Sequence, residues 1–296
     1  MASSYSSDVS DVNTYINFDG ALLRGDKAIL TADNRGFRYG DGLFETMKVA
    51  DGRLLLADYH FERLLTGLRT LQFDCPPFFT PAGLTGQILE LCKKNGHLLL
   101  ARVRLVVFRG EGGLYDPVNH FPHTVIQSAS LEAAAGALNT NGLQIGLFPE
   151  GRKSCDPFSN LKSNNYLLYV LAALYARKNR LNDCLVLNSR DRIADSTIAN
   201  LFYCRDGRVY TPPLSEGCVA GVMRRYLMDA MPRAGFDVTE KPVTPEDLEG
   251  AEEVFLTNAL RGIKWVQSFR DTHYNHQLSA AIYRACFPVA TASGLP

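Results

Sequence analysis

The sequence predicts an α+β fold in two domains, and three observations lead to this prediction. The chain has 296 residues, which is enough for one large domain or two medium ones. Strand and helix patterns mix along it without the strict βαβ alternation of a Rossmann fold. A run of small and turn-forming residues, EAAAGALNTNG, separates two halves near the middle. We therefore expect a disordered leader, a smaller N-terminal domain, an interdomain linker and a larger C-terminal domain at residues 1–14, 15–133, 134–142 and 143–296.

The N-terminal domain is predicted to begin with two β-hairpins. Asp-Gly pairs at 19–20 and 51–52 each lie between short apolar runs, which is the pattern of a hairpin. Residues 58–71 carry apolar side chains at helical spacing, so we expect a helix there. A second helix and two strands are expected at residues 81–94, 98–109 and 123–131.

The C-terminal domain is predicted to combine short strands with two helices. A strand at 143–148 should lead, through a loop rich in proline and glycine at 149–159, to a long helix at 165–179. The remaining strands and one further helix are expected at residues 183–187, 200–204, 208–210, 222–231 (the helix) and 253–256. The mixture again favours an α+β arrangement over a parallel sheet.

The composition is that of an ordinary soluble protein and excludes several classes of partner. Hydrophobic residues make up 46% and charged residues 21%. Because 31 basic residues balance 31 acidic ones, neither nucleic acid nor an anionic membrane is an expected partner. No apolar run approaches the roughly 20 residues that span a bilayer. The seven cysteines form no CxxC pair, and the N-terminus has no secretory pattern, so we expect reduced thiols and a cytoplasmic protein.

Two segments place polar side chains of catalytic type beside apolar elements. Lys162 comes just before an apolar helix, where shielding from water would free its amine as a nucleophile. A solvated lysine at a helix start is the commoner alternative. Asp195 precedes small hydroxyl residues and then an apolar strand, which by itself is also the pattern of an ordinary turn.

One further segment suggests a site for an anion, and none suggests a metal. The loop GCVAGVM opens a helix whose first N–H groups could bind an anion. The segment RGFRYGDGLFET holds three closely spaced glycines, and HFERL puts His60 and Arg63 one helical turn apart. His120 and His123 in NHFPH have no Cys, Asp or Glu to complete a ligand set, so we expect loop histidines and no metal.

Together these segments resemble the class IV aminotransferases, the fold-type IV enzymes that use pyridoxal 5'-phosphate (PLP). That family includes branched-chain and D-amino-acid aminotransferases and aminodeoxychorismate lyase. The resemblance covers about residues 15 to 270. It rests on six motifs in order: RGFRYGDGLFET, HFERL, LKSNNYL, DSTIANLF, TPPLSEGCVAGVMR and EVFLTNALRGI.

The resemblance implies a fold, a cofactor and roles for particular residues. It implies a small N-terminal α/β domain and a larger PLP-binding domain with a β-barrel-like core. Lys162 would form the Schiff base with PLP and then move the substrate's α-proton. Asp195, where most relatives carry Glu, would keep the pyridine nitrogen protonated. Arg63 would bind the phosphate together with backbone N–H groups, and Tyr166 would bind the phenolic oxygen. The residues that supply those N–H groups would be Thr197, Ile198, Val222 and Met223.

The resemblance also implies a substrate pocket, in which an arginine binds the substrate carboxylate. Arg104 and Arg109 are the candidates, and we favour Arg109 because its FRG turn is similar to that of D-amino-acid transaminases. Other pocket residues would be Phe44, Glu45, Tyr39, Thr257, Asn258 and Ala259. The partners would be an amino donor and a 2-oxo acid acceptor, and the enzyme would be a homodimer.

Two reactions and a third alternative stay open. The first is transamination through the Lys162 Schiff base. The second is β-elimination as in aminodeoxychorismate lyase, which gives 4-aminobenzoate and pyruvate. Met223, where aminotransferases usually carry Thr, and the Asn258-Ala259 pair are similar to the lyases, whereas the loop after Arg109 lacks the arginine that many lyases have there. The third is a PLP-binding paralogue without activity, which retention of Lys162, Arg63 and Asp195 disfavours.

Overall fold

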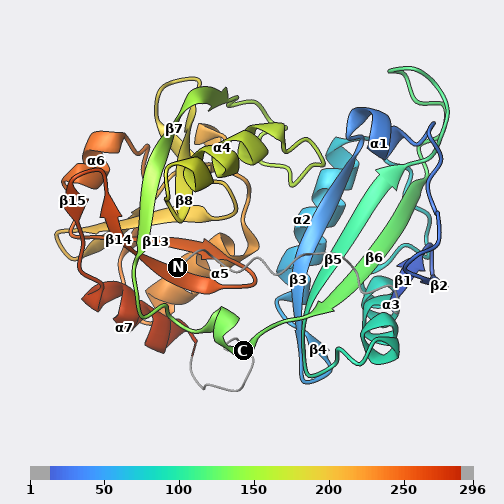
Figure 1. Ribbon diagram of the computed structural model, residues 1–296, viewed down its shortest axis with the longest axis horizontal. Coiled ribbons are helices and arrows are strands. Elements are labelled where there is room, and N and C mark those ends of the chain that lie inside the picture. The colour runs from blue at the N-terminus through green and yellow to red at the C-terminus, as the bar shows by residue number, and fades with distance from the viewer. Residues whose placement is uncertain (1–13, 288–296) are drawn as a thin grey trace. The chain divides into compact units, whose positions relative to one another are not determined.

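The computed structural model describes residues 14–287, so the predicted leader at 1–14 lies outside the described residues except for Thr14. The chain divides into two compact units (Figure 1). Among the described residues, the first holds 14–133 and 162–165, and the second holds 134–161 and 166–287. Residues 162–165, which include Lys162, thus make their contacts in the N-terminal unit although they lie far along the chain.

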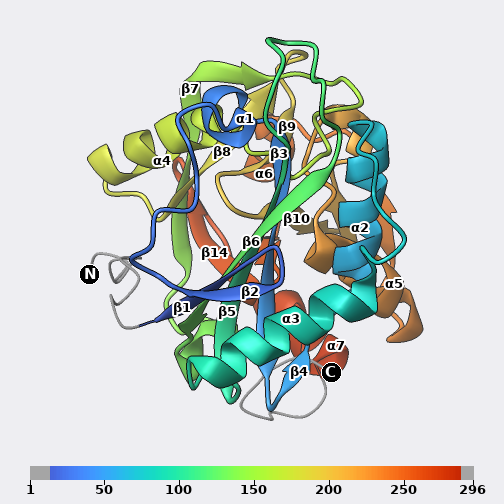
Figure 2. The same ribbon diagram turned by 90° about the vertical axis from the view of Figure 1, so that its right-hand side faces the viewer.

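The N-terminal unit is built on a six-stranded antiparallel sheet with the strand order β2-β1-β6-β5-β3-β4. Helices α2 and α3 pack against this sheet and contact each other (Figure 2). The strands are β1 (Tyr15–Phe18), β2 (Ala21–Arg24), β3 (Gly42–Ala50), β4 (Arg53–Leu54), β5 (Leu100–Arg109) and β6 (Pro122–Ser130). The helices are α1 (Arg35–Tyr39), α2 (Ala57–Thr70) and α3 (Pro81–Lys94). Both predicted hairpins and both predicted helices are confirmed, with bounds shifted by a residue or two.

The pairing of β3 with β5 decides which side chains share a face of this sheet. Because partners directly opposite each other point the same way, Thr46 and Arg104 share one face, as do Lys48 and Arg102. Glu45 lies on the other face, toward α2, where it meets residues of that helix.

The segment that carries Lys162 is attached to the end of β3 by backbone hydrogen bonds. The Phe44 N–H donates to the Lys162 carbonyl at 2.9 Å, and the Asn164 N–H donates to the Gly42 carbonyl at 3.0 Å. Gly42 leaves no room for a side chain, because a Cβ there would lie 2.3 Å from the Val107 carbonyl oxygen on β5 and 2.8 Å from Asn164 Nδ2 in the lysine segment. The close approach permitted by glycine therefore lets the lysine segment lie along the strand.

The C-terminal unit is built on a nine-stranded sheet curled into a half-barrel. Its order is β12-β11-β10-β13-β14-β7-β8-β9, with β15 paired to β14. Strand β7 runs parallel to both β8 and β14, and β11 runs parallel to β12. The strands are β7 (Leu143–Lys153), β8 (Asp183–Asn188), β9 (Ile193–Ser196), β10 (Asn200–Arg205), β11 (Arg208–Thr211), β12 (Val238–Glu240), β13 (Glu253–Asn258), β14 (Gly262–Phe269) and β15 (Thr272–His273).

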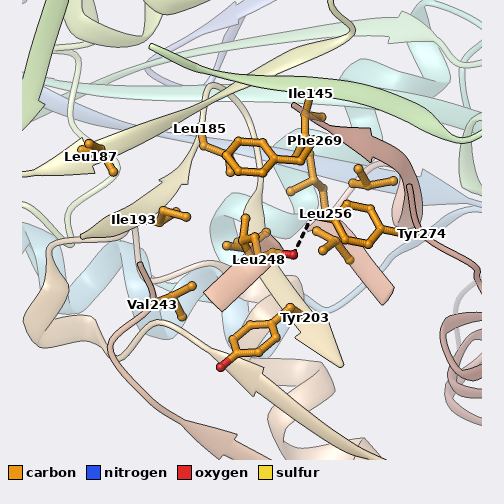
Figure 3. Close-up of a cluster of buried hydrophobic side chains, with 13 residues drawn as sticks. Ile145, Leu185, Leu187, Ile193, Tyr203, Val243, Leu248, Leu256, Phe269 and Tyr274 are labelled. Atoms are coloured by element: carbon orange, nitrogen blue, oxygen red, sulfur yellow. Dashed lines mark hydrogen bonds between the residues drawn. The ribbon is translucent and has the colours of Figure 1, made fainter. Parts of the chain in front are cut away.

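Four α-helices and two short 3₁₀ segments complete the described part of this unit. They are η1 (Ala133–Gly136), α4 (Leu167–Lys178), η2 (Leu214–Glu216), α5 (Val222–Arg233), α6 (Pro245–Glu249) and α7 (Gln277–Cys286). Buried side chains from several strands form a core of the unit, within which the Tyr274 hydroxyl donates to the Leu248 carbonyl (Figure 3). The predicted α+β fold is confirmed.

One predicted loop proved wrong in a way that matters for the site. Residues 149–153, expected to be irregular, extend strand β7 to Lys153. The register with β8 shifts between Leu147 and Arg152, and this irregularity accommodates Pro149 within the strand. The extension carries Lys153 into the buried part of the unit, where it is 9% exposed.

None of the helices within residues 14–287 combines the length and the apolar character that a membrane span needs. Over the same described residues, no cluster of three or more His, Cys, Asp or Glu side chains could hold a metal ion.

Candidate active site

The Lys162 amine lies against an aromatic ring in the N-terminal unit. Its Nζ is 4.4 Å from the centroid of the Phe44 ring, and the Arg104 guanidinium carbon is 4.0 Å from the same centroid. An aromatic face attracts cations within about 6 Å, so Phe44 holds both side chains near one ring. This places three of the predicted site residues together on the face of the sheet that carries Phe44.

A buried carboxylate, Glu45, organises the first helical turns of α2. The Glu45 side chain is 1% exposed; its Oε1 accepts from Arg63 Nε at 2.8 Å, and its Oε2 lies 2.7 Å from His60 Nδ1. Arg63 makes a second, closer contact to Oε2 through a terminal nitrogen. Burial by itself would raise the pKa of Glu45, but Arg63 and His60 together lower it to about 2. The carboxylate is therefore charged at any ordinary pH.

This arrangement favours the neutral form of His60 in one tautomer. Burial lowers the pKa of His60 and outweighs the opposite effect of Glu45, while Arg63 and Lys162 lower it further. A neutral imidazole next to a carboxylate must donate through Nδ1, which leaves Nε2 as an acceptor. That Nε2 is buried and has no hydrogen-bond partner among residues 14–287. It is a polar atom for which a ligand could supply the partner.

Arg109, the favoured carboxylate binder, is engaged by groups of its own unit. It is 4% exposed, and its Nε lies 3.1 Å from Asp41 Oδ2. Its terminal nitrogens donate to the carbonyls of Leu71 and Gln72, the latter at 3.1 Å, and one lies 2.9 Å from His120 Nδ1. These contacts tie the end of β5 to the segment after α2. His120, treated as a loop histidine, belongs to this network.

Asp41 also connects Arg109 to the loop after β5 through a second arginine. Arg35 pairs with Asp41 at 2.9 Å and donates to carbonyls between Gly112 and Tyr115. The Tyr115 ring lies 5.6 Å from the ring of Tyr39, which is half-buried. Tyr39 is thus next to the loop, and no contact between it and Lys162 is described.

Basic side chains gather on the sheet face that carries Arg104. Arg102 and Lys48 are paired across β5 and β3, two residues from the pair of Arg104 and Thr46, and therefore lie on the same face. Lys48 is 2% exposed, and burial lowers its pKa to about 8. A face with this many cations suits a ligand that carries a carboxylate.

In the C-terminal unit, Asp195 is buried among donors. It lies on β9, is 2% exposed, and accepts from Lys153 Nζ at 3.3 Å and from the Val219 N–H at 2.9 Å. The Tyr169 hydroxyl lies 3.1 Å and 3.0 Å from its two oxygens. Tyr166, the predicted ligand of the phenolic oxygen, precedes α4, and its ring centroid is 4.8 Å from that of Tyr169.

The N-terminus of α5 has the form of an anion site. Val222 and Met223 are its first residues, and Gly221, the residue before them, provides no side-chain cap. A Cβ at Gly221 would lie 1.8 Å from Asn200 Oδ1, so a larger residue there would displace the Asn200 side chain. The uncapped N–H groups of a helix N-terminus bind anions readily.

The other predicted phosphate residues have different environments. Thr197 is tied to the buried Asp183, to which its N–H donates at 3.2 Å and its hydroxyl at 2.6 Å. Ile198 is 46% exposed, and its carbonyl accepts from the Asn258 side chain at 3.4 Å.

Thr257 lies opposite Asn200 across β10 and β13, which places both side chains on one face of the sheet. Its hydroxyl is buried and has no hydrogen-bond partner among the described residues. Ala259 follows Asn258, whose side-chain oxygen accepts from the N–H groups of the next turn at 3.1 Å and 2.8 Å.

Sequence reasoning missed several residues that hold these groups in place. Lys153, Tyr169 and Asp183 are buried and contact predicted site residues. The only signal for Tyr169 was its position within an apolar helix, which equally predicts a core residue. His60 was noted one turn before Arg63, but nothing in the spacing showed that Glu45 would join them.

Comparison with known proteins places the chain in a family. Residues 42–269 match the family model described as amino-transferase class IV. An aminodeoxychorismate lyase of Vibrio harveyi is 33% identical over 233 residues, which are 78% of this chain and 83% of that protein. A D-alanine aminotransferase of Staphylococcus haemolyticus is 25% identical over 256 residues, 83% of this chain and 85% of that protein.

The fold agrees with that of a solved structure. The branched-chain amino acid aminotransferase of Escherichia coli superposes with a TM-score of 0.84 at 23% identity, covering 95% of this chain and 96% of that one. The match to the family model spans most of the sequence and includes Lys162, Asp195 and the start of α5. The chain therefore belongs to the class IV aminotransferase family.

Proposed function

We propose that this protein is a PLP-dependent aminotransferase that transfers an amino group between an amino acid and a 2-oxo acid, with PLP bound to Lys162 as a Schiff base. The observation that carries the proposal is the position of Lys162 in a family whose members use PLP. The Lys162 carbonyl accepts from the Phe44 N–H of β3 at 2.9 Å, and the Lys162 amine lies over the Phe44 ring. A lysine placed in this way has a defined direction for its amine.

The side chains present fit PLP. A phosphate needs hydrogen-bond donors, and the uncapped start of α5 supplies them. The buried Thr257 hydroxyl has no partner among the described residues and can donate. A ring nitrogen needs a buried carboxylate, which Asp195 supplies. When bound, PLP supplies an electron sink for the bonds broken at the substrate carbon.

Each residue would then act by binding, orienting or moving a proton. The Lys162 amine would hold the cofactor and carry the substrate's α-proton. Glu45 fixes the Arg63 side chain in one orientation from which it would bind the phosphate. Val222 and Met223 would donate backbone N–H groups, together with Ile198 and Thr197, and Tyr166 would donate to the phenolic oxygen.

For the substrate carboxylate we propose Arg104 ahead of Arg109. The Arg109 guanidinium already donates to Leu71, Gln72 and Asp41, so a substrate would have to displace protein acceptors. Arg104 is favoured by its place, because its guanidinium carbon and the Lys162 amine lie over the same Phe44 ring. The proposal keeps Phe44, Tyr39, Asn258 and Ala259 as pocket residues and adds Lys48 and Arg102.

The test is a half-reaction followed by visible absorption. The purified protein loaded with PLP is mixed with single L- and D-amino acids and no acceptor. Transamination predicts a lasting loss of the visible band as the amino group stays on the cofactor, and recovery of the band when a 2-oxo acid is added. No band change with any amino donor would contradict the proposal.

A second candidate function is aminodeoxychorismate lyase. It is favoured by the Vibrio harveyi relative, which is 33% identical, and by Met223 and the Asn258-Ala259 pair. Release of pyruvate and 4-aminobenzoate from aminodeoxychorismate, without a lasting loss of the visible band, would establish this activity. The proposed enzyme is a cytoplasmic homodimer, and sedimentation at micromolar concentration would measure its mass.

A further inference from the structure

The carboxylate of Asp195 is surrounded by three donors from three different parts of the C-terminal unit. Lys153 comes from the end of β7, Tyr169 from α4, and the Val219 N–H from the loop before α5. The side chains of Asp195 and Lys153 are 3% and 10% exposed. A buried ion pair of this kind is costly to disturb, because each charge loses water on burial.

The two oxygens of Asp195 are used unequally. Oδ2 accepts from Lys153 at 3.3 Å, from Val219 at 2.9 Å and from Tyr169 at 3.0 Å, whereas the only described contact of Oδ1 is that of Tyr169 at 3.1 Å. A carboxylate has about four lone-pair positions, two on each oxygen. Lys153 and the Val219 N–H therefore fill the two positions on Oδ2, and the one hydroxyl hydrogen of Tyr169 is shared between the oxygens, so Oδ1 retains a position for one more donor.

The groups around this pair keep fixed protonation states. Burial, followed by the charge of Asp195, raises the pKa of Tyr169 well above its ordinary value, so its hydroxyl stays a donor. Burial also raises the pKa of Cys218 to about 12, against Arg224, so that thiol stays neutral beside Asp195 and Lys153. The Lys153 amine further lies 5.2 Å from the centroid of the Tyr169 ring. Lys153 thus brings the compensating charge to Asp195.

We infer that Lys153 is a positioning residue that holds Asp195 by Oδ2 and leaves Oδ1 to accept from the N–H of a pyridine ring. The charge of Lys153 also lowers the proton affinity of the ring nitrogen bound to Oδ1. The inference rests on the proposed function, since it assigns the ring to PLP. A cation near a carboxylate offsets its charge. A protonated ring nitrogen at Oδ1 is therefore stabilised less by the Asp195–Lys153 ion pair than it would be by the Asp195 carboxylate alone. Without Lys153 the ring would keep its proton to higher pH.

The ion pair can be tested without any cofactor. Urea unfolding of the PLP-free protein is compared for the wild type, Lys153→Met, Asp195→Asn and the double variant. Each single change leaves a buried partner uncompensated. The urea midpoint of the double variant should therefore fall by less than the sum of the decreases in the two single variants. Additive losses would overturn the inference, whatever the protein does with PLP.

The effect on the ring is tested with PLP labelled with ¹⁵N in the pyridine nitrogen. The ¹⁵N shift of the bound cofactor is followed against pH in the wild type, Lys153→Met and Lys153→Arg. We expect Lys153→Met to move the deprotonation of the ring upward by about one pH unit, a tenfold change in proton affinity, and Lys153→Arg to restore the wild-type curve. Lys178→Met, on the exposed end of α4, is the matched control and should change nothing.

Identical titrations of the wild type and Lys153→Met would overturn the inference. They would show that Lys153 only stabilises the fold. Absence of a bound ¹⁵N signal in the wild type would instead overturn the proposed function and with it the effect on the ring, while the unfolding comparison would still judge the ion pair.

Discussion

At the residue scale, single buried charges decide how the candidate site residues are held. Glu45 fixes Arg63 and His60, Asp195 is fixed by Lys153, and both carboxylates are almost fully buried. The sequence pointed to Arg63 and Asp195 because each lies within a family motif. It did not point to Lys153, because a contact between residues 42 positions apart is made by the sheet and not by local spacing.

Replacing Glu45 by Gln should destabilise the protein strongly. The amide removes the charge that compensates Arg63, and breaking a buried pair in this way costs about 3–5 kcal/mol. Denaturant unfolding measures the loss. Glu90→Gln, at an exposed position on α3, is the control and should stay within about 0.5 kcal/mol of the wild type. A Glu45→Gln protein as stable as that control would contradict the role given to the carboxylate.

The same carboxylate should make stability depend on pH in a defined window. The pKa of Glu45 is lowered from 4.5 to about 2, so its contribution is fully present above about pH 4.5 and is lost as pH falls toward 2. Unfolding measured at successive pH values should show this loss in the wild type. In Glu45→Gln the slope of stability against pH should be shallower below pH 4.5, and an unchanged slope would count against the pairing.

Arg104 and Arg109 should respond differently to replacement by Met. Arg104→Met should raise the KM for the substrate, because its proposed partner is the substrate carboxylate. Arg109→Met should lower stability, since it removes the donor of the Leu71 and Gln72 carbonyls and one of the two arginines that pair with Asp41. Steady-state kinetics and thermal unfolding of both variants separate the two roles. The reverse pattern would restore Arg109 as the carboxylate binder.

At the element scale, glycines set how closely the site segments approach. The expected strand at 143–148 was visible as a pattern, but the extension of β7 to Lys153 was not, because a proline normally ends a strand. The attachment of the Lys162 segment to β3 was equally invisible, since it joins parts of the chain more than 100 residues apart.

Gly42→Ala should displace the Lys162 segment. A Cβ at position 42 would lie 2.3 Å from the Val107 carbonyl and 2.8 Å from Asn164 Nδ2, so backbone must move. We expect lower stability and weaker PLP binding, measured by thermal unfolding and by titration of the visible band. Gly86→Ala is the matched control, because it lies within helix α3 and a Cβ there meets nothing within 4 Å. The control should gain about 0.4–1 kcal/mol. Equal behaviour of the two variants would contradict the close approach.

At the scale of the whole molecule, the chain passes between its two units more than once. Residues 162–165 belong with the N-terminal unit, while the residues before and after them belong with the C-terminal unit. The α+β class and the family could be predicted from the sequence, because strand and helix patterns and ordered motifs are local. The assignment of residues 162–165 to the N-terminal unit could not be predicted, because it depends on backbone hydrogen bonds that side-chain patterns do not reveal.

This connectivity predicts that the two units unfold together. The single tryptophan, Trp265, lies on β14, so its fluorescence reports the C-terminal unit, whereas far-ultraviolet circular dichroism reports both. The two signals should follow one transition in urea, since unfolding of either unit releases part of the other. A circular dichroism transition that begins before the fluorescence transition would show independent units.

The central claim is that Lys162 binds the cofactor, and one measurement addresses it directly. The PLP-loaded protein is reduced with borohydride, which fixes the cofactor on the lysine that holds it, and the modified peptide is identified by mass spectrometry. The account predicts modification at Lys162 and its absence, together with loss of the visible band, in Lys162→Ala. Modification at Lys153 or Lys48 instead, or a visible band that persists in Lys162→Ala, would contradict it.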